Sequence, residues 1–205
     1  MLEAVNLTCA RGERKLFSGL NFSLRGGNVV QAFGPNGSGK TSLLRIICGL
    51  AAPAAGEVRW KGTNISRLGE EYFGQIAYVA HQNGTKDELD PIENLRISSG
   101  VAGHSLSKQE AQGVLELVGL SKQKHLPARL LSAGQRRRLA LSRLLASRAR
   151  LWILDEPLAS LDDDGALLAR NLISEHLSNQ GMAIIATHEE MEMDLSAGQM
   201  QRIEL

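Results

Sequence analysis

GPNGSGKT at residues 34–41 is the stretch of this sequence that decides the fold. It follows an apolar segment at 28–33 and precedes the apolar residues of a helix that we expect to run to about Gly49. Glycines in such a loop let successive backbone N–H groups point inward at phosphate groups, and the start of the helix adds a favourable partial charge. A strand that leads through glycines into a helix is the context that a phosphate-binding loop requires. The sequence therefore predicts an α/β protein that binds a nucleotide.

Two residues of this loop carry the reactive groups. Lys40 supplies a mobile cation for the β and γ phosphates, and the Thr41 hydroxyl is suited to ligate Mg²⁺. A Gly-rich turn with a purely structural role is the weaker alternative. The candidate phosphate contacts extend over the whole loop and are Gly34, Pro35, Asn36, Gly37, Ser38, Gly39, Lys40, Thr41 and Ser42.

The composition limits the class of protein further. A chain of 205 residues with 43% hydrophobic content can bury one sizeable core in one or two domains. Its net charge of +1 gives no global attraction to nucleic acid or to an anionic membrane. Cys9 and Cys48 make no disulfide framework, and we expect a reduced, cytoplasmic compartment. We also expect no secretory signal, and the weakly polar run at 46–56 is too short to span a bilayer, so any membrane role is predicted to be peripheral.

Apolar segments on both sides of the loop predict the remaining elements. Those at 150–155 and 181–188 are typical of strands buried on both faces, and residues 163–179 form a crossover helix between them. Alternating strands and helices around a phosphate loop predict an open, mainly parallel α/β sheet. Further strands are expected near 2–8, 20–24 and 56–60, with a helical subdomain at 86–149 inserted into a core of residues 1–85 and 150–205.

The motif LWILDEP at 151–157 begins as an apolar strand and contains two adjacent acids. Asp155 ends the strand, where its carboxylate can reach a metal directly or through water. Glu156 comes next and could orient or deprotonate an attacking water. An Asp-Glu pair alone often caps a helix or ends a strand, but the phosphate loop favours the catalytic interpretation.

LSAGQ at 131–135 lies between these two motifs, and the three motifs in this order resemble those of ABC-type ATPases over nearly the whole chain. Ser132 and Gly134 offer a hydroxyl and a bare backbone at a helix start, which is an anion-binding arrangement. The resemblance implies a P-loop core with a mainly parallel sheet, an antiparallel β portion and an inserted α-helical subdomain. It also implies a homodimer that sandwiches two ATP molecules, in which Ser132, Gly134 and Gln135 complete the site of the opposing chain.

The same resemblance assigns three further residues. Gln82 ligates Mg²⁺ with Thr41 and Asp155, and it begins the loop near which a membrane subunit docks. Asp162, in SLD at 160–162, contacts the partner across the dimer interface. His188, which alone is more often a core or turn histidine, becomes the switch residue at the γ phosphate. Glu156, His188 and Gln82 are thus the expected catalytic set, with ATP and Mg²⁺ as cofactors.

Arginines raise two separate expectations. Arg136, Arg137 and Arg138 point in different directions on a helix, so we expect them to be solvated or paired with acids, with nucleic-acid contact as a minor alternative. Arg11 stands near the place where ABC ATPases usually carry an aromatic residue that stacks on adenine, and Phe17 lies too far along the chain to replace it. A guanidinium can also stack on a base, at roughly 0.5 to 2 kcal/mol.

Within the ABC family, the chain resembles the ATP-binding subunit of the cytochrome c maturation complex, or heme exporter. The segments that carry this resemblance are LFSGLNFSL at 16–24, HQNGTK at 81–86, ENLR at 93–96 and the LWILDEP strand. It implies integral membrane partners, a peripheral position on the cytoplasmic face of the bacterial inner membrane, and release of a heme-loaded chaperone. His81, His104 and His125 suggest heme ligands, but scattered histidines are ordinary surface content, and no direct heme binding is expected.

Three alternatives compete with this interpretation. The first is the ATPase subunit of another transporter, for a lipid, a metal or a small solute. The second is a soluble ABC ATPase that acts on nucleic acid, whose relatives normally carry long coiled coils or two ATPase units that this chain lacks. The third is a P-loop kinase, which leaves LSAGQ unexplained.

Overall fold

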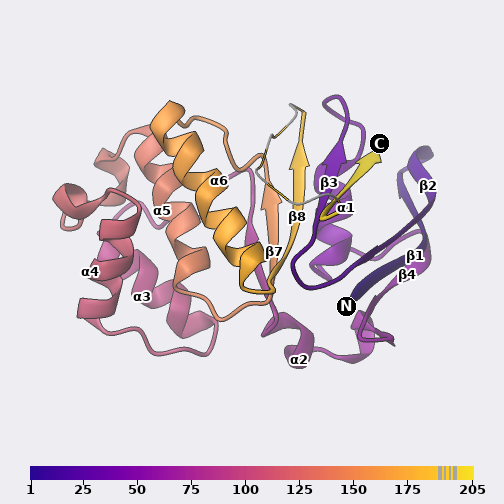
Figure 1. Ribbon diagram of the computed structural model, residues 1–205, viewed down its shortest axis with the longest axis horizontal. Coiled ribbons are helices and arrows are strands. Elements are labelled where there is room, and N and C mark those ends of the chain that lie inside the picture. Colours follow the sequence, from indigo (N-terminus) through magenta and orange to yellow (C-terminus); the bar gives the residue numbers. More distant parts are fainter. Residues whose placement is uncertain (189–190, 192, 194, 196–197) are drawn as a thin grey trace.

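The centre of the protein is a five-stranded parallel sheet in the order β6-β7-β8-β3-β9. A computed structural model describes residues 1–188, 191, 193, 195 and 198–205. Figure 1 shows the carboxyl ends of these strands at one edge, with helices on both faces of the sheet. The strands are β6 (Ile76–Val79), β7 (Leu151–Asp155), β8 (Met182–Thr187), β3 (Val29–Phe33) and β9 (Met200–Glu204).

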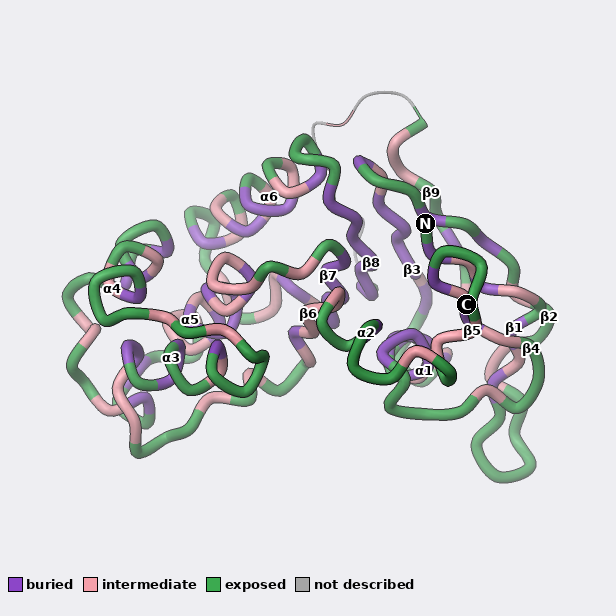
Figure 2. The backbone as a smooth tube through the Cα atoms, turned by 90° about the horizontal axis from the view of Figure 1, so that it is seen from below, coloured by how far each residue is buried: buried purple, intermediate pink, exposed green. Residues whose placement is uncertain are grey.

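The two faces of this sheet belong to two separate hydrophobic clusters. In β7, Trp152 and Leu154 join one cluster, whereas Leu151 and Ile153 join the other. Successive side chains of a strand point to opposite faces, so an apolar run without polar interruptions is what a strand buried on both faces requires. Figure 2 shows β7, β8 and β3 buried in the middle of the molecule, between α6 and α1.

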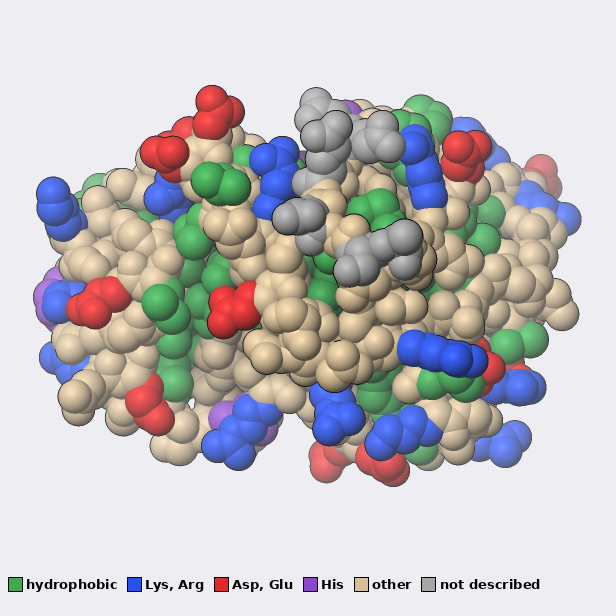
Figure 3. All heavy atoms as spheres, in the orientation of Figure 1, with side chains coloured by type: hydrophobic (Ala, Val, Ile, Leu, Met, Phe, Trp, Pro, Cys, Tyr) green, Lys and Arg blue, Asp and Glu red, His purple; other side chains and the backbone are tan. Residues whose placement is uncertain are grey.

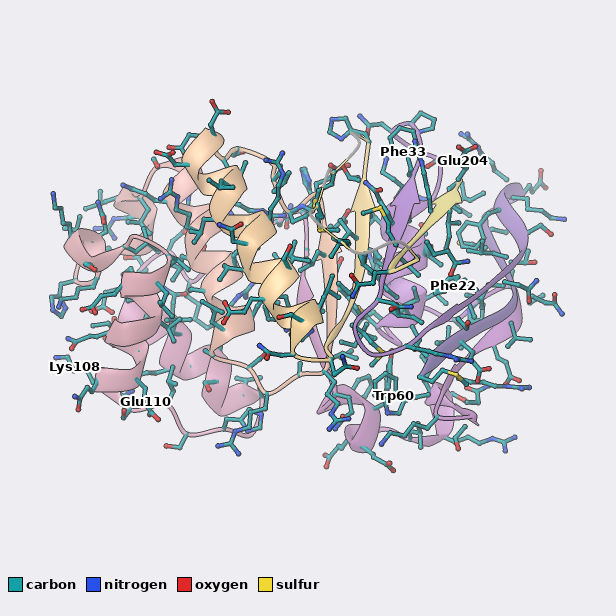
Figure 4. All side chains as sticks on the ribbon, viewed as in Figure 1. Phe22, Phe33, Trp60, Lys108, Glu110 and Glu204 are labelled. Atoms are coloured by element: carbon teal, nitrogen blue, oxygen red, sulfur yellow. The ribbon has the colours of Figure 1, made fainter. Side chains whose placement is uncertain are left out.

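A second, antiparallel sheet in the order β2-β1-β4-β5 lies beside the parallel one. Its inward side chains, among them Phe22 and Trp60, join the cluster that also holds the apolar face of α1 (Figure 4). The predicted fold class, a mainly parallel core with an antiparallel portion, is confirmed. The strands are β1 (Leu2–Arg11), β2 (Arg14–Leu24), β4 (Ala55–Trp60) and β5 (Thr63–Asn64).

Helices fill the chain between β6 and β7, as the periodicity predicts. Asp90, Ser107 and Ser132 each cap one of them, and in each case the residue three positions on completes a capping box. The buried residues of these helices join the same cluster as one face of the sheet, so this region does not have a core of its own. The helices are α1 (Lys40–Ile47), α2 (Glu70–Phe73), α3 (Pro91–Val101), α4 (Lys108–Leu117), α5 (Ala133–Leu145) and α6 (Asp163–Ser178), with 3₁₀ turns at Ile65–Arg67, Ser121–Gln123 and Ala128–Leu130.

Gly56 is the tightest point of the antiparallel sheet. The pairing of β1 with β4 shifts register between Val5 and Thr8, and Gly56 lies against this bulge with φ +80°. A Cβ on Gly56 would come within 2.3 Å of the Asn6 carbonyl oxygen and 2.4 Å of the Val5 carbonyl oxygen. Backbone oxygens cannot move aside as a flexible side chain can, so only glycine fits here.

We predict that Gly56→Ala lowers the free energy of unfolding by roughly 3 kcal/mol, because the clash adds to the cost of a left-handed backbone. Gly62→Ala is the matched control, since Gly62 has φ +84° but, its chain neighbours aside, no described residue comes within 4 Å of its Cβ position. That control should lose only about 1 to 2 kcal/mol. Urea denaturation followed by circular dichroism measures both, and equal losses would show that the contact with β1 is unimportant.

Candidate active site

The phosphate-binding loop connects β3 to α1 at the carboxyl edge of the parallel sheet, where open α/β sheets bind their ligands. Figure 4 marks this edge by Phe33 and Glu204, which pair at the ends of β3 and β9. No side chain caps the start of α1 at Gly39, so its first N–H groups remain available to an anion. The Cβ position of Gly39 is 3.1 Å from Leu16 and 3.2 Å from Phe17, which hold β2 closely against the loop.

Lys40 is held within the loop that it serves. Its side chain is only 7% exposed, and Nζ donates hydrogen bonds to the carbonyl oxygens of Gly34 at 2.6 Å and Pro35 at 3.2 Å. Among the described residues, the one acid within 4.0 Å of Nζ is Glu156, through its Oε1. The Ser38 hydroxyl oxygen is buried without a hydrogen-bond partner among the described residues. A cation and an unpaired polar atom beside the same loop suit an anionic ligand.

Thr41 and Asp155 meet although 114 residues separate them in the chain. The Thr41 hydroxyl donates a hydrogen bond of 2.8 Å to Oδ2 of Asp155, which is the last residue of β7. Burial raises the pKa of Asp155, and the hydrogen bond from Thr41 opposes that shift. A hydroxyl and a carboxylate placed together offer the hard oxygen donors that Mg²⁺ prefers.

Glu156 leaves β7 in a left-handed backbone conformation, with φ +50°. Its N–H donates a hydrogen bond to the Ala186 carbonyl oxygen at 2.9 Å, which fixes this turn to β8. Its Oε2 is 2.9 Å from Nδ1 of His188, and His188 directly follows β8. The acid expected to activate water and the expected switch histidine are therefore in direct contact.

These residues line one pocket of about 500 Å³. Nine of the predicted site residues line it, and the chain adds five others that include the expected base-stacking candidate Arg11. The predicted nine are Asn36, Gly37, Gly39, Lys40, Thr41, Ser42, Asp155, Glu156 and His188. The other five are Arg11, Arg14, Leu16, His81 and Ala159.

The wall expected to face the base consists of Arg11, Arg14 and Leu16. Phe17 does not line the pocket, but it packs against Gly39 despite its distance from Arg11 along the chain. Sequence reasoning missed Arg14 and Leu16, because the hairpin of β1 and β2 brings them back over the loop. The alternation of residues along β2 is the one signal that could have indicated Leu16.

Gln82 is exposed and does not line this pocket, whereas its neighbour His81 does. The residues that are expected to act across a dimer interface do not line this pocket either. Ser132 accepts a hydrogen bond from the Gln135 N–H at 3.2 Å, and Asp162 caps α6 and pairs with Arg138 at 2.6 Å. The roles of Gln82, Ser132, Gly134, Gln135 and Asp162 therefore stay predictions.

One expectation about the arginines is wrong. Arg138 is paired with an acid, as expected, and that acid is Asp162, but Arg137 is only 2% exposed and forms no ion pair with an acid among the described residues. Its guanidinium binds the backbone carbonyls of Ala80, which follows β6, and of Asp155, which ends the neighbouring strand β7. A run of three arginines does not show which member points inward, because that depends on what packs against the helix.

Two further observations concern membrane-spanning helices and metal-binding clusters. None of the described helices is long and apolar enough to cross a bilayer. In the described part of the chain, no three His, Cys, Asp or Glu side chains form a group that could hold a metal. Mg²⁺ typically takes only one or two carboxylates and completes its shell with phosphates and water, so the pair of Thr41 and Asp155 fits this ion.

Comparisons with known proteins agree with this geometry. The ABC transporter family profile matches residues 17–159. The cytochrome c biogenesis ATP-binding export protein CcmA of Nitrosospira multiformis is 52% identical over 204 residues, covering 100% of this chain and 98% of the relative. The protein of the same name in Dechloromonas aromatica is 45% identical over 205 residues and covers 100% of both chains.

Solved structures share the fold. An ABC transporter ATP-binding protein from Pyrococcus furiosus superposes with a TM-score of 0.84 at 27% identity, covering 98% of this chain and 96% of that one. The ATP-binding cassette MJ0796, in a dimeric post-hydrolysis state with ADP and phosphate, gives 0.80 at 25% identity, covering 92% and 88%. With this fold and this pocket, the chain is an ABC-type ATPase that uses ATP. It belongs to the ABC transporter family and, within it, to the family of cytochrome c biogenesis ATP-binding export proteins.

Proposed function

We propose that this chain hydrolyses ATP to drive an export complex for c-type cytochrome biogenesis, and that its work there is release of a heme-loaded chaperone. The observation that carries the proposal is identity of 52% and 45% over the whole chain with two proteins named for that process. The pocket supports it, because the cation, the two acids and the histidine that such an ATPase needs lie together.

The chemistry divides among the pocket residues. Lys40 binds the β and γ phosphates, and Glu156 accepts the proton of the attacking water. His188, at 2.9 Å from the Glu156 carboxylate, holds that acid in place and contacts the γ phosphate. Thr41 and Asp155 would hold Mg²⁺, and Gln82, which does not line the pocket, would be a further ligand. Bound there, Mg²⁺ neutralises charge on the phosphates.

The partners are inferred from the predicted ATP-binding residues that lie outside the pocket. Ser132, Gly134 and Gln135 begin α5 outside the pocket of their own chain, and we infer that they complete the site of a second copy, with Asp162 at the interface. The dimeric cassette MJ0796 supports this arrangement by its fold and identity. Integral membrane subunits bind the same dimer at the cytoplasmic face of the bacterial inner membrane.

Neither nucleic acid nor heme belongs among these partners. On the face shown in Figure 3, basic and acidic side chains are interspersed rather than gathered by sign, which agrees with the net charge of +1. The three histidines that suggest heme ligands form no common group in the described part of the chain. His81 lines the nucleotide pocket, His125 lies 3.7 Å from Asp90, and His104 follows α3.

Lys40→Ala should weaken ATP binding or turnover by about 10- to 100-fold, because a buried cation contributes roughly 1.5 to 3 kcal/mol to such contacts. Binding of a fluorescent ATP analogue and release of phosphate measure the two effects. Lys108→Ala is the control, since Lys108 is exposed at the start of α4, far from the pocket (Figure 4). Near-normal ATPase in Lys40→Ala would remove the loop from the mechanism.

Glu156→Gln should bind Mg-ATP but hydrolyse it about 100- to 10,000-fold more slowly, because the general base is lost while the phosphate contacts remain. It should therefore accumulate as a dimer on size exclusion with ATP, whereas Glu116→Gln, at an exposed position of α4, should behave as the wild type. Adding Ser132→Arg should prevent the dimer without preventing ATP binding. A Glu156→Gln chain that binds ATP tightly yet stays monomeric contradicts the sandwich.

Deletion of the gene in its host should abolish holocytochrome c, leave b-type cytochromes intact and strand heme on the periplasmic chaperone. Heme staining of membrane and periplasmic fractions measures all three. The wild-type gene and the Lys108→Ala variant should restore assembly, and Lys40→Ala should not. Unchanged c-type cytochromes in the deletion strain would assign the ATPase to another transporter.

A further inference from the structure

Arg137 lies in α5, five residues after the Ser132 cap, and is almost completely buried. Nη2 of its guanidinium donates to the carbonyl oxygens of Asp155 at 2.7 Å and Glu156 at 2.6 Å, and Nε donates to that of Pro157 at 3.2 Å. One edge of the group therefore binds three consecutive carbonyls. These are the carbonyls of the turn that carries both pocket acids.

The other edge of the same guanidinium reaches a different segment. Nη1 donates to the Ala80 carbonyl oxygen at 2.8 Å and to Oδ1 of Asn83 at 3.2 Å. These two acceptors flank His81, which lines the pocket, and Gln82, the expected Mg²⁺ ligand. A single side chain thus bridges the segments that follow the neighbouring strands β6 and β7, and each of these segments contributes residues to the pocket.

Only arginine suits this position. Its planar group holds five N–H donors in a fixed fork, whereas lysine offers three donors on one point charge. Burial lowers the pKa of Arg137, and the negative charges of Asp155 and Glu156 oppose this shift. Burying a cation among dipoles rather than against a carboxylate is costly for stability, so a structural role alone is a poor explanation.

The carbonyl groups that Arg137 binds hold Glu156 in an unfavourable backbone conformation. Glu156 has φ +50°, and a side-chain-bearing residue in this region persists only where its surroundings fix it. The Glu156 N–H is fixed by Ala186 on β8, and Arg137 fixes the carbonyls on both sides of the Glu156 Cα. The direction in which the Glu156 carboxylate leaves the backbone therefore depends on the guanidinium.

We propose that Arg137 is a positioning residue for ATP hydrolysis, which orients Glu156 and the His81–Gln82 segment together and ties both to the helix that begins at Ser132. This inference rests on the proposed role of Glu156. Arg137 does not touch the phosphate loop through any of its hydrogen bonds, so it acts on turnover and leaves ATP affinity to Lys40 and the loop backbone.

The test compares Arg137→Lys and Arg137→Met with Arg136→Met in the full-length protein. Arg136 is the matched control, because it is the preceding residue of α5 and, within the described part of the chain, its side chain donates a single hydrogen bond, of 3.5 Å, to the Arg129 carbonyl. At saturating Mg-ATP, we expect kcat to fall about 10- to 100-fold in both Arg137 variants, as for a catalytic group displaced by about 1 Å. ATP affinity should change by less than about threefold, and Arg136→Met should keep both values.

A double variant distinguishes positioning from general stability. If Arg137 acts mainly through Glu156, single-turnover hydrolysis by Arg137→Lys with Glu156→Gln should be at most about fivefold slower than by Glu156→Gln alone, which is the part that acts through the His81–Gln82 segment. Multiplying losses would overturn the proposal, as would kcat and ATP affinity falling together. An unchanged kcat in Arg137→Lys, with hydrolysis lost in Glu156→Gln, would overturn it while leaving the role of Glu156 intact. Full hydrolysis by Glu156→Gln would instead refute the role of that acid.

Asn83→Ala keeps the test decisive if the Arg137 variants do not fold. It removes one acceptor while the guanidinium keeps its four carbonyl partners, so folding should be preserved. We expect kcat to fall by about two- to fivefold with ATP affinity unchanged, because the His81–Gln82 segment loosens. Wild-type turnover in this variant would overturn the bridge between the two segments.

Discussion

The hydrogen bond between the Thr41 hydroxyl and the Asp155 carboxylate, 2.8 Å long, is the constraint on which the site depends. It can form only if α1 starts beside the end of β7, although β8 lies between β7 and β3 in the sheet. The apolar face of α1 makes this possible, because Leu43 and Ile47 pack in the same cluster as Ile153 of β7. The helix that presents the loop is thereby fixed against the strand that presents the acid.

Two cations lie beside the acids of this site. Lys40 faces the Glu156 carboxylate from the loop side, and Arg137 binds the backbone of the same residue from the α5 side. One cation therefore lies near the Glu156 carboxylate, and another binds the backbone that carries it. Removing water strengthens each of these interactions, and it also explains why burial raises the pKa of Asp155. Such a site holds its charges in place before a substrate arrives, which is the main way in which proteins stabilise developing charge.

The sequence allowed the loop, the buried strands and the acids to be predicted, because each is a local pattern with a physical cause. It predicted α6 to within one residue of its end at Ser178. It did not predict β9, whose residues are mostly exposed at the sheet edge and lack an apolar run. Nor could it show that Arg137 points inward or that Phe17 returns to the loop, since both depend on which distant elements pack together. For the same reason, His81 rather than Gln82 lines the pocket.

The double burial of the parallel sheet has a consequence for how the chain can evolve. In β7, residues alternate between the two hydrophobic clusters, and Asp155 falls on the same phase as Leu151 and Ile153, toward α1. Exchanging one aliphatic residue for another disturbs a single cluster, but inserting or deleting one residue inverts every side chain beyond it. Such a change would exchange both cores and turn the acid away from Thr41 at once. Many combinations of aliphatic residues are therefore compatible with this strand, whereas a change of its length by one residue is not.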